Sequence, residues 1–486
     1  MGGIKLQDFI FSIVRRDGSF QLDSYEGSSR RVVIPSEHEG RKVTAIGDNA
    51  FSWHTEITSV IIPDSVIAIG EAVFSWCDHL EEIVLPESIK QIGEWAFIGC
   101  SALKEIVLPD IIRKINYSTF QSCVSLQKIH LPDSLRSIGT EAFAECKNLR
   151  EIVFPKGLTT IDDGAFTSCE SLTTISIPNA LTELGKTVFT GCTSLTNFEI
   201  SDKHSVFRVT DSNALINVNT SELVFVPYDK KEKTFCVPGG IRILAEEVFM
   251  NHHMLESVSL PDSLESIGKK AFYGCRNLRY LDIPASVRKI GSSAFHGCSS
   301  INSVLLPPEL QVLEYAVFYA CHSLEHVRLP ESLKMIAACA FSGCSSVMNI
   351  HLPDSVLEIG ESAFEGCRTL IEVSFPESLE QIGTHAFGSC SQLETVSTNR
   401  CLKQLPGRCF SRCTNLNQVN LMDGLEEIGP CCFESCHSLM SLQIPGSVHE
   451  ISPDSFEDCS HLMLFVSSDS YAANYAKDVG MLFSEN

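Results

Sequence analysis

The chain contains 21 cysteines, and most of them recur at one position of a periodic pattern. A thiol can bind zinc, form a disulfide or act as a nucleophile, so this spacing is the first place to look for chemistry. His54 and His252 occupy the same position in the repeats that begin each run. Fifteen cysteines stand three residues after a phenylalanine: Cys77, Cys100, Cys123, Cys146, Cys169, Cys192, Cys275, Cys298, Cys321, Cys344, Cys367, Cys390, Cys413, Cys436 and Cys459.

The spacing of these cysteines favours packing over chemistry. Zinc sites need clustered pairs such as C-x-x-C, and the nearest groupings, Cys409 with Cys413 and Cys431/Cys432 with Cys436, are spaced differently. Thiols stacked by translation lie close enough for a disulfide, yet their Cα–Cβ bonds run parallel instead of converging. We therefore expect free, buried thiols that act as small apolar core residues, and no metal or cofactor.

The phenylalanines that precede these cysteines define an internal repeat. The unit around each one has the form L-x-x-I-x-L-P-x-S-L-x-x-I-G-x-x-A-F-x-x-C. A unit this small cannot bury its own apolar face, so it must stack on its neighbours. The phenylalanines recur every 23 residues in a run of seven and, after one interruption, a run of ten: Phe51, Phe74, Phe97, Phe120, Phe143, Phe166 and Phe189, then Phe249, Phe272, Phe295, Phe318, Phe341, Phe364, Phe387, Phe410, Phe433 and Phe456.

Each unit predicts three short elements. Residues 80–85 alternate apolar and polar side chains and predict a short strand, which Pro86 closes because proline cannot donate to a sheet. Residues 88–92 predict a second extended piece, and residues 96–100 fit one helical or 3₁₀ turn. Stacking places parallel strands roughly 4.8 Å apart. The predicted fold is an α/β repeat solenoid, an array of short parallel strands with one-turn helical segments.

With this unit, as in "CRTLIEVSFPESLEQIGTHAFGSC", the chain resembles the BspA-like leucine-rich repeat family. Members of that family are surface and secreted proteins of gut and oral bacteria and of parasitic protists. The resemblance extends from about residue 30 to 482. It implies a right-handed, curved solenoid, a location at the cell surface or in secretion, and roles in adhesion or recognition.

Departures from the repeat predict the organisation of the chain. Alternating runs joined by Asp17-Gly18 indicate a hairpin, and "ALINVNTSELVFVP" indicates another with its turn near residues 217–221. The second one either keeps an irregular coil in the stack or is an exposed recognition feature. We expect an N-terminal hairpin cap and first coil in 1–50, repeats in 51–197, an irregular coil with a hairpin insertion in 198–248, repeats in 249–466 and a C-terminal helical cap in 467–486.

The formal charge of −23 limits the class of partner. It argues against nucleic acid and anionic membranes, which reward clustered cations, and favours basic or neutral protein or glycan partners. No run of 18 uncharged apolar residues predicts membrane insertion. The apolar run "FIFSIV" is too short for a signal peptide core and is followed by Arg15 and Arg16. We therefore expect no export signal in this chain, which leaves a cytoplasmic location open.

The sequence carries no motif that indicates catalysis. It has no P-loop, no G-x-S-x-G, no H-E-x-x-H and no dinucleotide fingerprint, so we expect a protein that is not an enzyme. Acidic residues such as Glu87 and Asp354 follow the repeat proline, often with serine next. They indicate turns in which Asp and Ser bond their own backbone, or alternatively a weak Ca²⁺ site.

The outward strand positions of the N-terminal coils are the best candidates for binding. They form an apolar stripe that His130 interrupts, and such a stripe indicates an interaction site unless these residues merely suit strands. Tyr228, Lys230 and Lys231 of the insertion are further candidates. The stripe and its polar flanks comprise Ile61, Val84, Val107 and Val153 with Glu82, Glu105, Lys128 and Glu151.

Two functions from different classes fit these observations. The first is a non-enzymatic binding or adhesion module that presents a solenoid face to a protein or glycan. The alternative is an intracellular structural scaffold or self-assembling subunit. The family resemblance favours the first, and the missing export signal favours the second. The oligomeric state stays open.

Overall fold

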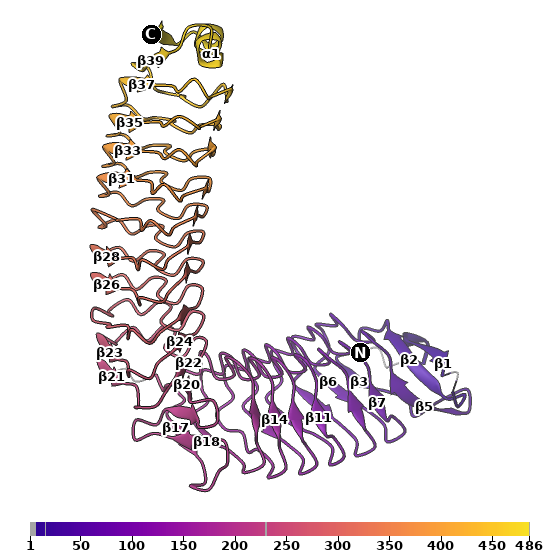
Figure 1. The fold of residues 1–486 in the computed structure, drawn as a ribbon. Helices are drawn as coiled ribbons and strands as arrows, with labels where there is room; N and C mark the ends of the chain where they lie inside the picture. Colours follow the sequence, from indigo (N-terminus) through magenta and orange to yellow (C-terminus); the bar gives the residue numbers. More distant parts are fainter. Residues whose placement is uncertain (1–5, 15, 229–230, 486) are drawn as a thin grey trace. The chain divides into compact units, whose positions relative to one another are not determined.

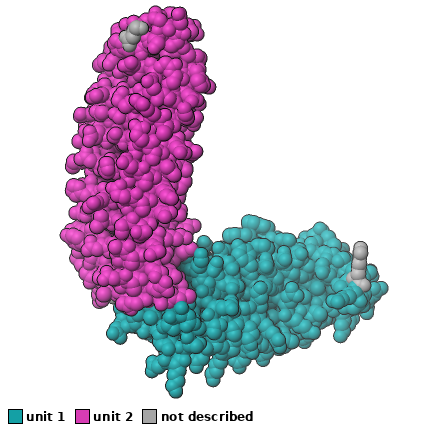
Figure 2. Space-filling view, in the orientation of Figure 1, with its two compact units in different colours: residues 1–219, 224–228 teal, residues 220–223, 229–486 magenta. Residues whose placement is uncertain are grey.

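Short parallel strands follow one another along the chain as a β-solenoid of about 20 turns. The structure is a computed structural model that describes residues 6–14, 16–228 and 231–485 (Figure 1). Two compact units divide the chain (Figure 2). Unit 1 comprises residues 1–219 and 224–228, and unit 2 comprises residues 220–223 and 229–486.

Most coils begin with a short strand whose central residue is buried or half-buried and whose flanking residues face outward. Neighbouring strands pair in parallel in the repeat register, as Glu105 does with Lys128 and Ile106 with Ile129. This first strand row comprises β3 (Arg31–Val33), β6 (Ser59–Ile61), β8 (Glu82–Val84), β10 (Glu105–Val107), β12 (Lys128–His130), β15 (Thr174–Ser176), β17 (Asn197–Glu199), β21 (Thr234–Cys236), β23 (Ser257–Ser259), β26 (Ser303–Leu305), β28 (His326–Arg328), β31 (Glu372–Ser374), β33 (Thr395–Ser397), β35 (Gln418–Asn420), β37 (Ser441–Gln443) and β39 (Met463–Val466).

A second strand row follows the repeat proline and pairs in the same register, as Ser137 does with Thr160. It confirms the second extended piece predicted for each unit. The row comprises β5 (Arg41–Ile46), β7 (Ala68–Ile69), β9 (Gln91–Ile92), β11 (Lys114–Ile115), β13 (Ser137–Ile138), β14 (Thr160–Ile161), β16 (Glu183–Leu184), β22 (Ile243–Leu244), β24 (Ser266–Ile267), β25 (Lys289–Ile290), β27 (Val312–Leu313), β29 (Met335–Ile336), β30 (Glu358–Ile359), β32 (Gln381–Ile382), β34 (Gln404–Leu405), β36 (Glu427–Ile428) and β38 (Glu450–Ile451).

The segment around each phenylalanine is a series of turns, so the expected one-turn helices are not confirmed. Trp95 and Gly99 have φ angles of 55° and 72°, and such left-handed residues interrupt a right-handed helix. The N–H groups of Trp95, Phe97 and Gly99 donate to carbonyls of the next coil, while those of Ile98 and Cys100 donate within the turn. The turns therefore form a third ladder between coils.

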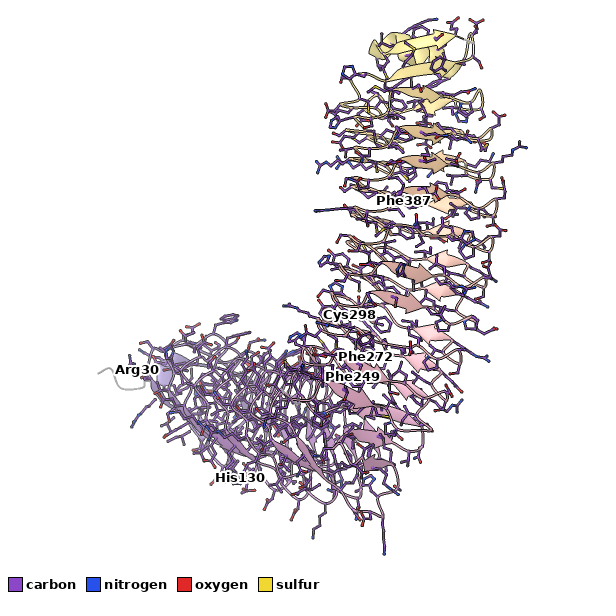
Figure 3. The ribbon with its side chains drawn as sticks, turned by 90° about the vertical axis from the view of Figure 1, so that its left-hand side faces the viewer. Arg30, His130, Phe249, Phe272, Cys298 and Phe387 are labelled. Carbon is purple, nitrogen blue, oxygen red and sulfur yellow. The ribbon has the colours of Figure 1, made fainter. Side chains whose placement is uncertain are left out.

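The phenylalanines stack through the core of each unit. In unit 2 the rings of Phe249 and Phe272 lie 5.0 Å apart with their planes within 7° (Figure 3). In unit 1 the rings of Phe97 and Phe120 lie 5.4 Å apart with their planes within 2°. Because the coils repeat by translation, each ring meets its neighbour face to face, and burial of this aromatic column supplies much of the hydrophobic stabilisation.

The repeat cysteines pack beside this column as buried free thiols. Each also donates a hydrogen bond to the phenylalanine carbonyl of the preceding coil, as Cys298 Sγ does to Phe272 O at 3.1 Å (Figure 3). Burial raises the pKa of the Cys298 thiol well above its ordinary value. All fifteen make this bond. The side chain thus combines an apolar body with a weak donor that an alanine would lack.

The serines after the repeat proline also connect adjacent coils. The Ser355 hydroxyl donates to the Leu333 carbonyl of the preceding coil at 2.7 Å. The expectation that these serines bond their own backbone is therefore wrong, because each hydroxyl donates to a carbonyl of the neighbouring coil. The same bond is made by Ser88, Ser134, Ser263, Ser286, Ser332, Ser378 and Ser447.

The N-terminal hairpin and the C-terminal helix have the elements expected from the sequence. β1 (Phe9–Ile13) pairs antiparallel with β2 (Phe20–Tyr25), after the 3₁₀ turn η1 (Leu6–Asp8). β4 (Glu37–His38) pairs antiparallel with β5. The helix α1 (Tyr471–Val479) begins after Ser470, whose side chain accepts from the Ala473 N–H, and precedes β40 (Leu482–Glu485), which pairs with β39. These elements cover strand edges that would otherwise invite further pairing.

Between β17 and β21, the described residues of the interruption form three further strands. β18 (Phe207–Val209) pairs antiparallel with β19 (Leu215–Asn217). β20 (Glu222–Phe225) follows after a turn at residues 218–221 and neighbours β19 in the sheet, which is the hairpin expected here. The sequence analysis missed β18.

Replacement of Phe341 by alanine tests the aromatic column. Phe341 is fully buried and stacks on Phe318 and Phe364 at 5.5 and 5.3 Å. Phe341→Ala should lower the free energy of unfolding by about 3 to 5 kcal/mol, as measured by urea denaturation. Tyr315→Ala, at a 54% exposed aromatic, serves as control and should cost less than about 0.5 kcal/mol. Equal losses in the two variants would contradict the role of the column.

The pH dependence of stability tests the buried thiols. Burial raises the pKa of Cys321 to about 12, so the stability that this thiol contributes is complete below the pKa of an unfolded thiol and is lost as the pH rises towards 12. The difference in unfolding free energy between the wild type and Cys321→Ala should therefore shrink by about 1.4 kcal/mol per pH unit above about pH 9. Urea denaturation at neutral and alkaline pH measures it, and a difference independent of pH would contradict the prediction.

Candidate functional site

The outward face of the first strand row in unit 1 carries a line of exposed apolar side chains. Val84 is 65% exposed, whereas its neighbour Ile83 points into the core. The alternation predicted from the sequence is therefore present. We call this line the apolar row, and its members are Val33, Ile61, Val84, Val107 and Val153.

The ladder register aligns part of the apolar row. Val33 pairs with Ile61, and Ile61 pairs with Val84. Val33 was missed by the sequence analysis, although the strand "RVV" before the first complete repeat carries the same alternation.

The strand expected at residues 151–153 does not form. Glu151 and Val153 are both exposed and Val153 reaches 77%, so the alternation of side chains persists without a strand. The Thr173 N–H still bonds the Arg150 carbonyl at 3.4 Å, but no ladder pairs residues 151–153 with a neighbouring strand. Val153 therefore belongs to the apolar row by its exposure and not by strand pairing.

A polar rim flanks the apolar row. Glu82, Glu105 and Lys128 are exposed at the first position of their strands. His130, which pairs with Val107 in the ladder, places its Nε2 atom 2.9 Å from Oε1 of Glu105. Both side chains are about half exposed, so solvent screens this contact, which is an ion pair only when the imidazole is protonated, and it contributes little to stability. An apolar centre with a charged rim is the arrangement found in protein interfaces.

The described candidates in the insertion, Tyr228 and Lys231, fall in different compact units. Tyr228 belongs to unit 1 and is half-buried, whereas Lys231 belongs to unit 2 and is exposed. Lys230 lies outside the described residues. Lys233, part of the same basic run, forms an ion pair with Glu256 at 2.8 Å. This pairing neutralises one charge of the basic patch.

A metal site finds no support in the described ranges. Within 6–14, 16–228 and 231–485, no three His, Cys, Asp or Glu side chains are grouped to hold an ion. One carboxylate that follows a repeat proline, Glu87, accepts a hydrogen bond from the Asp110 N–H at 3.0 Å. Asp110 belongs to the next coil, so this bond joins two coils and does not test the turn interpretation, in which the side chain bonds its own backbone. The Ca²⁺ alternative gains no support from the described residues.

Unit 2 contains a groove, which is a second candidate binding surface and was not predicted from the sequence. It has a volume of about 530 Å³ and lies over β26 and β28. Exposed Leu305 and Met348 line it together with Arg328. The sequence does contain a feature that could have indicated this groove. At the outward strand positions of these coils, some of the serine, threonine and asparagine residues found in other coils are replaced by larger side chains.

Three of the solved structures that are similar to this chain are bacterial proteins. A leucine-rich cell-surface protein of Faecalibacterium prausnitzii A2-165 is 24% identical, with 86% of this chain and 94% of that chain covered and a TM-score of 0.49. A leucine-rich repeat protein of Bacteroides ovatus ATCC 8483 is 25% identical, with 96% and 88% covered and a TM-score of 0.37. The pneumococcal vaccine antigen PcpA is 18% identical, with 99% and 98% covered and a TM-score of 0.41. No curated protein matches the chain.

A family model supports the same relationship from the sequence. The model of the BspA type leucine-rich repeat region, which holds six copies of the repeat, matches residues 44–134, 113–228, 224–348 and 335–463. These overlapping matches cover most of the chain and include both runs of phenylalanines. The chain therefore belongs to the BspA-type leucine-rich repeat family.

Proposed function

We propose that the chain is a non-enzymatic binding module that presents the apolar row of unit 1 to a partner. The observation that carries the proposal is the alignment of exposed Val33, Ile61 and Val84 on paired strands. Contiguous apolar side chains on a water-facing surface cost free energy that binding recovers, so they mark interaction sites. The core of each unit uses the inward positions, which leaves the outward ones free to vary with the partner.

The chemistry of the apolar row favours a protein over a glycan. Its members are aliphatic and β-branched, and aliphatic side chains gain most from contact with other apolar side chains. The rim contributes both signs of charge through Glu82, Glu105 and Lys128, which suits a polar interface edge. With a formal charge of −23 on the chain, a basic or neutral protein meets the least electrostatic repulsion.

We place this binding at the cell surface or in secretion, as a role in adhesion or host recognition. Membership of the BspA-type family supports that location. In the described ranges, no helix has both the length and the apolar character needed to cross a bilayer. Surface labelling of cells that express the native full-length protein tests the location, and a protein labelled only after cell lysis would contradict it.

A pair of charge substitutions tests the apolar row. Val84→Glu combined with Val107→Glu should weaken partner capture by about 2 kcal/mol or more, because both carboxylates would be desolvated in the interface. The melting temperature should barely change, since both side chains already face water. Quantitative pull-down from host-cell surface extracts, with captured proteins identified by mass spectrometry, measures the effect.

A matched control separates the site from the added charge. Ser374→Glu combined with Asn420→Glu adds the same two charges at the same strand position in unit 2, where both side chains are exposed. This variant should capture the partner as well as the wild type does. Equal capture by the Val84/Val107 variant and the wild type would overturn the proposal.

A further inference from the structure

The outward face of the first strand row in unit 2 changes character over a few coils. On either side it presents small polar residues, such as Ser257 and Ser259 in β23 and Thr395 and Ser397 in β33. Between these strands, half of the outward positions hold larger side chains with apolar or cationic groups, namely Tyr280, Leu305, His326, Arg328 and His351, and the others hold Asp282, Ser303, Asn349, Glu372 and Ser374. Tyrosine, arginine and methionine are the residues that interfaces enrich and that carry most of their binding energy.

The backbone is also irregular at this place. β26 and β28 form a two-stranded sheet, as three other strand pairs of the first row do. On either side, single bridges join Ser257 to Tyr280 and Asn349 to Glu372 in place of continued ladders. The groove of about 530 Å³ lies at this interruption. Its position coincides with the change of side chains, so sequence and backbone mark the same surface.

The groove offers an apolar contact surface. Leu305 is 64% exposed and Met348 is about half exposed, and both line the groove beside the buried Val304. Tyr280, 67% exposed, precedes the lining residue Leu281. Methionine adapts its shape to a partner side chain, which suits it to a docking surface.

Arg328 is the one Arg or Lys side chain among the residues that line the groove. In unit 2, cations commonly meet a carboxylate one repeat away, as Arg242 meets Glu265 and Lys403 meets Glu426, each at 2.8 Å. The residue one repeat before Arg328 is Leu305, its neighbour in the ladder, and the residue one repeat after it is His351. Arg328 therefore has no carboxylate at the position where Arg242 and Lys403 find theirs.

The two carboxylates that line the groove, those of Asp282 and Glu325, also leave Arg328 unpaired. Within the described part of the chain, neither forms an ion pair with it. The guanidinium stands beside Leu305 on a strongly anionic protein, where a carboxylate from outside would find a bidentate partner next to an apolar contact.

We propose that this groove is a second docking surface, for a segment of a partner protein that carries an apolar side chain next to a carboxylate. The apolar side chain contacts Leu305 and Met348, and the carboxylate pairs with Arg328. The proposal rests on the proposed function in that it treats the chain as a binding module. It concerns another unit and other residues, so the two can fail separately.

Selection from a displayed library of random heptapeptides against the intact chain tests the proposal. The selected sequences should share an apolar residue beside Asp or Glu, and synthetic copies provide the probes. Arg328→Gln should weaken their binding at least tenfold, and exchange of the peptide carboxylate for its amide should give the same loss. Because both changes remove one interaction, the amide peptide should bind the wild type and Arg328→Gln equally well.

Two controls confine the effect to the groove. Arg368→Gln removes an exposed arginine elsewhere in unit 2 and should leave peptide binding unchanged. The Val84→Glu/Val107→Glu variant should also bind the peptides as the wild type does, whereas Leu305→Glu should bind them at least tenfold more weakly. Capture of the unit 1 partner by Leu305→Glu should be normal, which distinguishes failure at one surface from failure at the other.

Three outcomes would overturn the proposal. The first is a selection that enriches no peptide above background. The second is a set of enriched peptides that lack a carboxylate or bind Arg328→Gln as tightly as the wild type. The third is binding of sulfated oligosaccharides, tested in parallel, that depends on Arg328 while no peptide binding does.

Discussion

The fold depends on hydrogen bonds from the backbone of each coil to the next. Both strand rows and the turns around the phenylalanines bond in one register, and the cysteine and serine side chains add bonds to carbonyls of the preceding coil. A backbone with so few helical residues has no other way to satisfy its buried N–H and C=O groups. An insertion or deletion within a coil would shift every one of these ladders at once. The uniform repeat length follows from this constraint.

The same constraint assigns different roles to the inward and the outward side chains of each coil. Inward positions must repeat, since each side chain packs on its copy in the next coil, as Phe249 packs on Phe272. Outward strand positions face water and are free to differ. The apolar row in unit 1 and the groove in unit 2 both consist of outward positions where neighbouring coils differ from the polar average. A binding module can acquire surfaces in this way without changing its core.

The sequence predicted the strands, the buried thiols and the alternation around Val84, because each depends on a period that one unit repeats. It did not predict the ladder between the turns, which requires residues such as Trp95 to adopt a left-handed backbone. Tryptophan is unfavourable in that conformation, so its presence does not predict such a turn. Nor did it predict the bond from Cys298 to the Phe272 carbonyl, which becomes visible only when coils are stacked. The groove at Leu305 arises from residues that differ between coils. The repeat unit was defined by the residues that the coils share, so it does not predict this groove.

Amide hydrogen exchange at the turns is the most direct test of the coil-to-coil ladder. The Phe364 N–H bonds the Ala386 carbonyl of the next coil at 2.7 Å, although it belongs to no strand or helix. If the ladder exists, this amide and its equivalents at Phe272 and Phe341 should exchange as slowly as the strand amides of the same coils. Exchange of these amides at the rate of exposed loops, with the strand amides protected, would contradict a register held on all three sides of each coil.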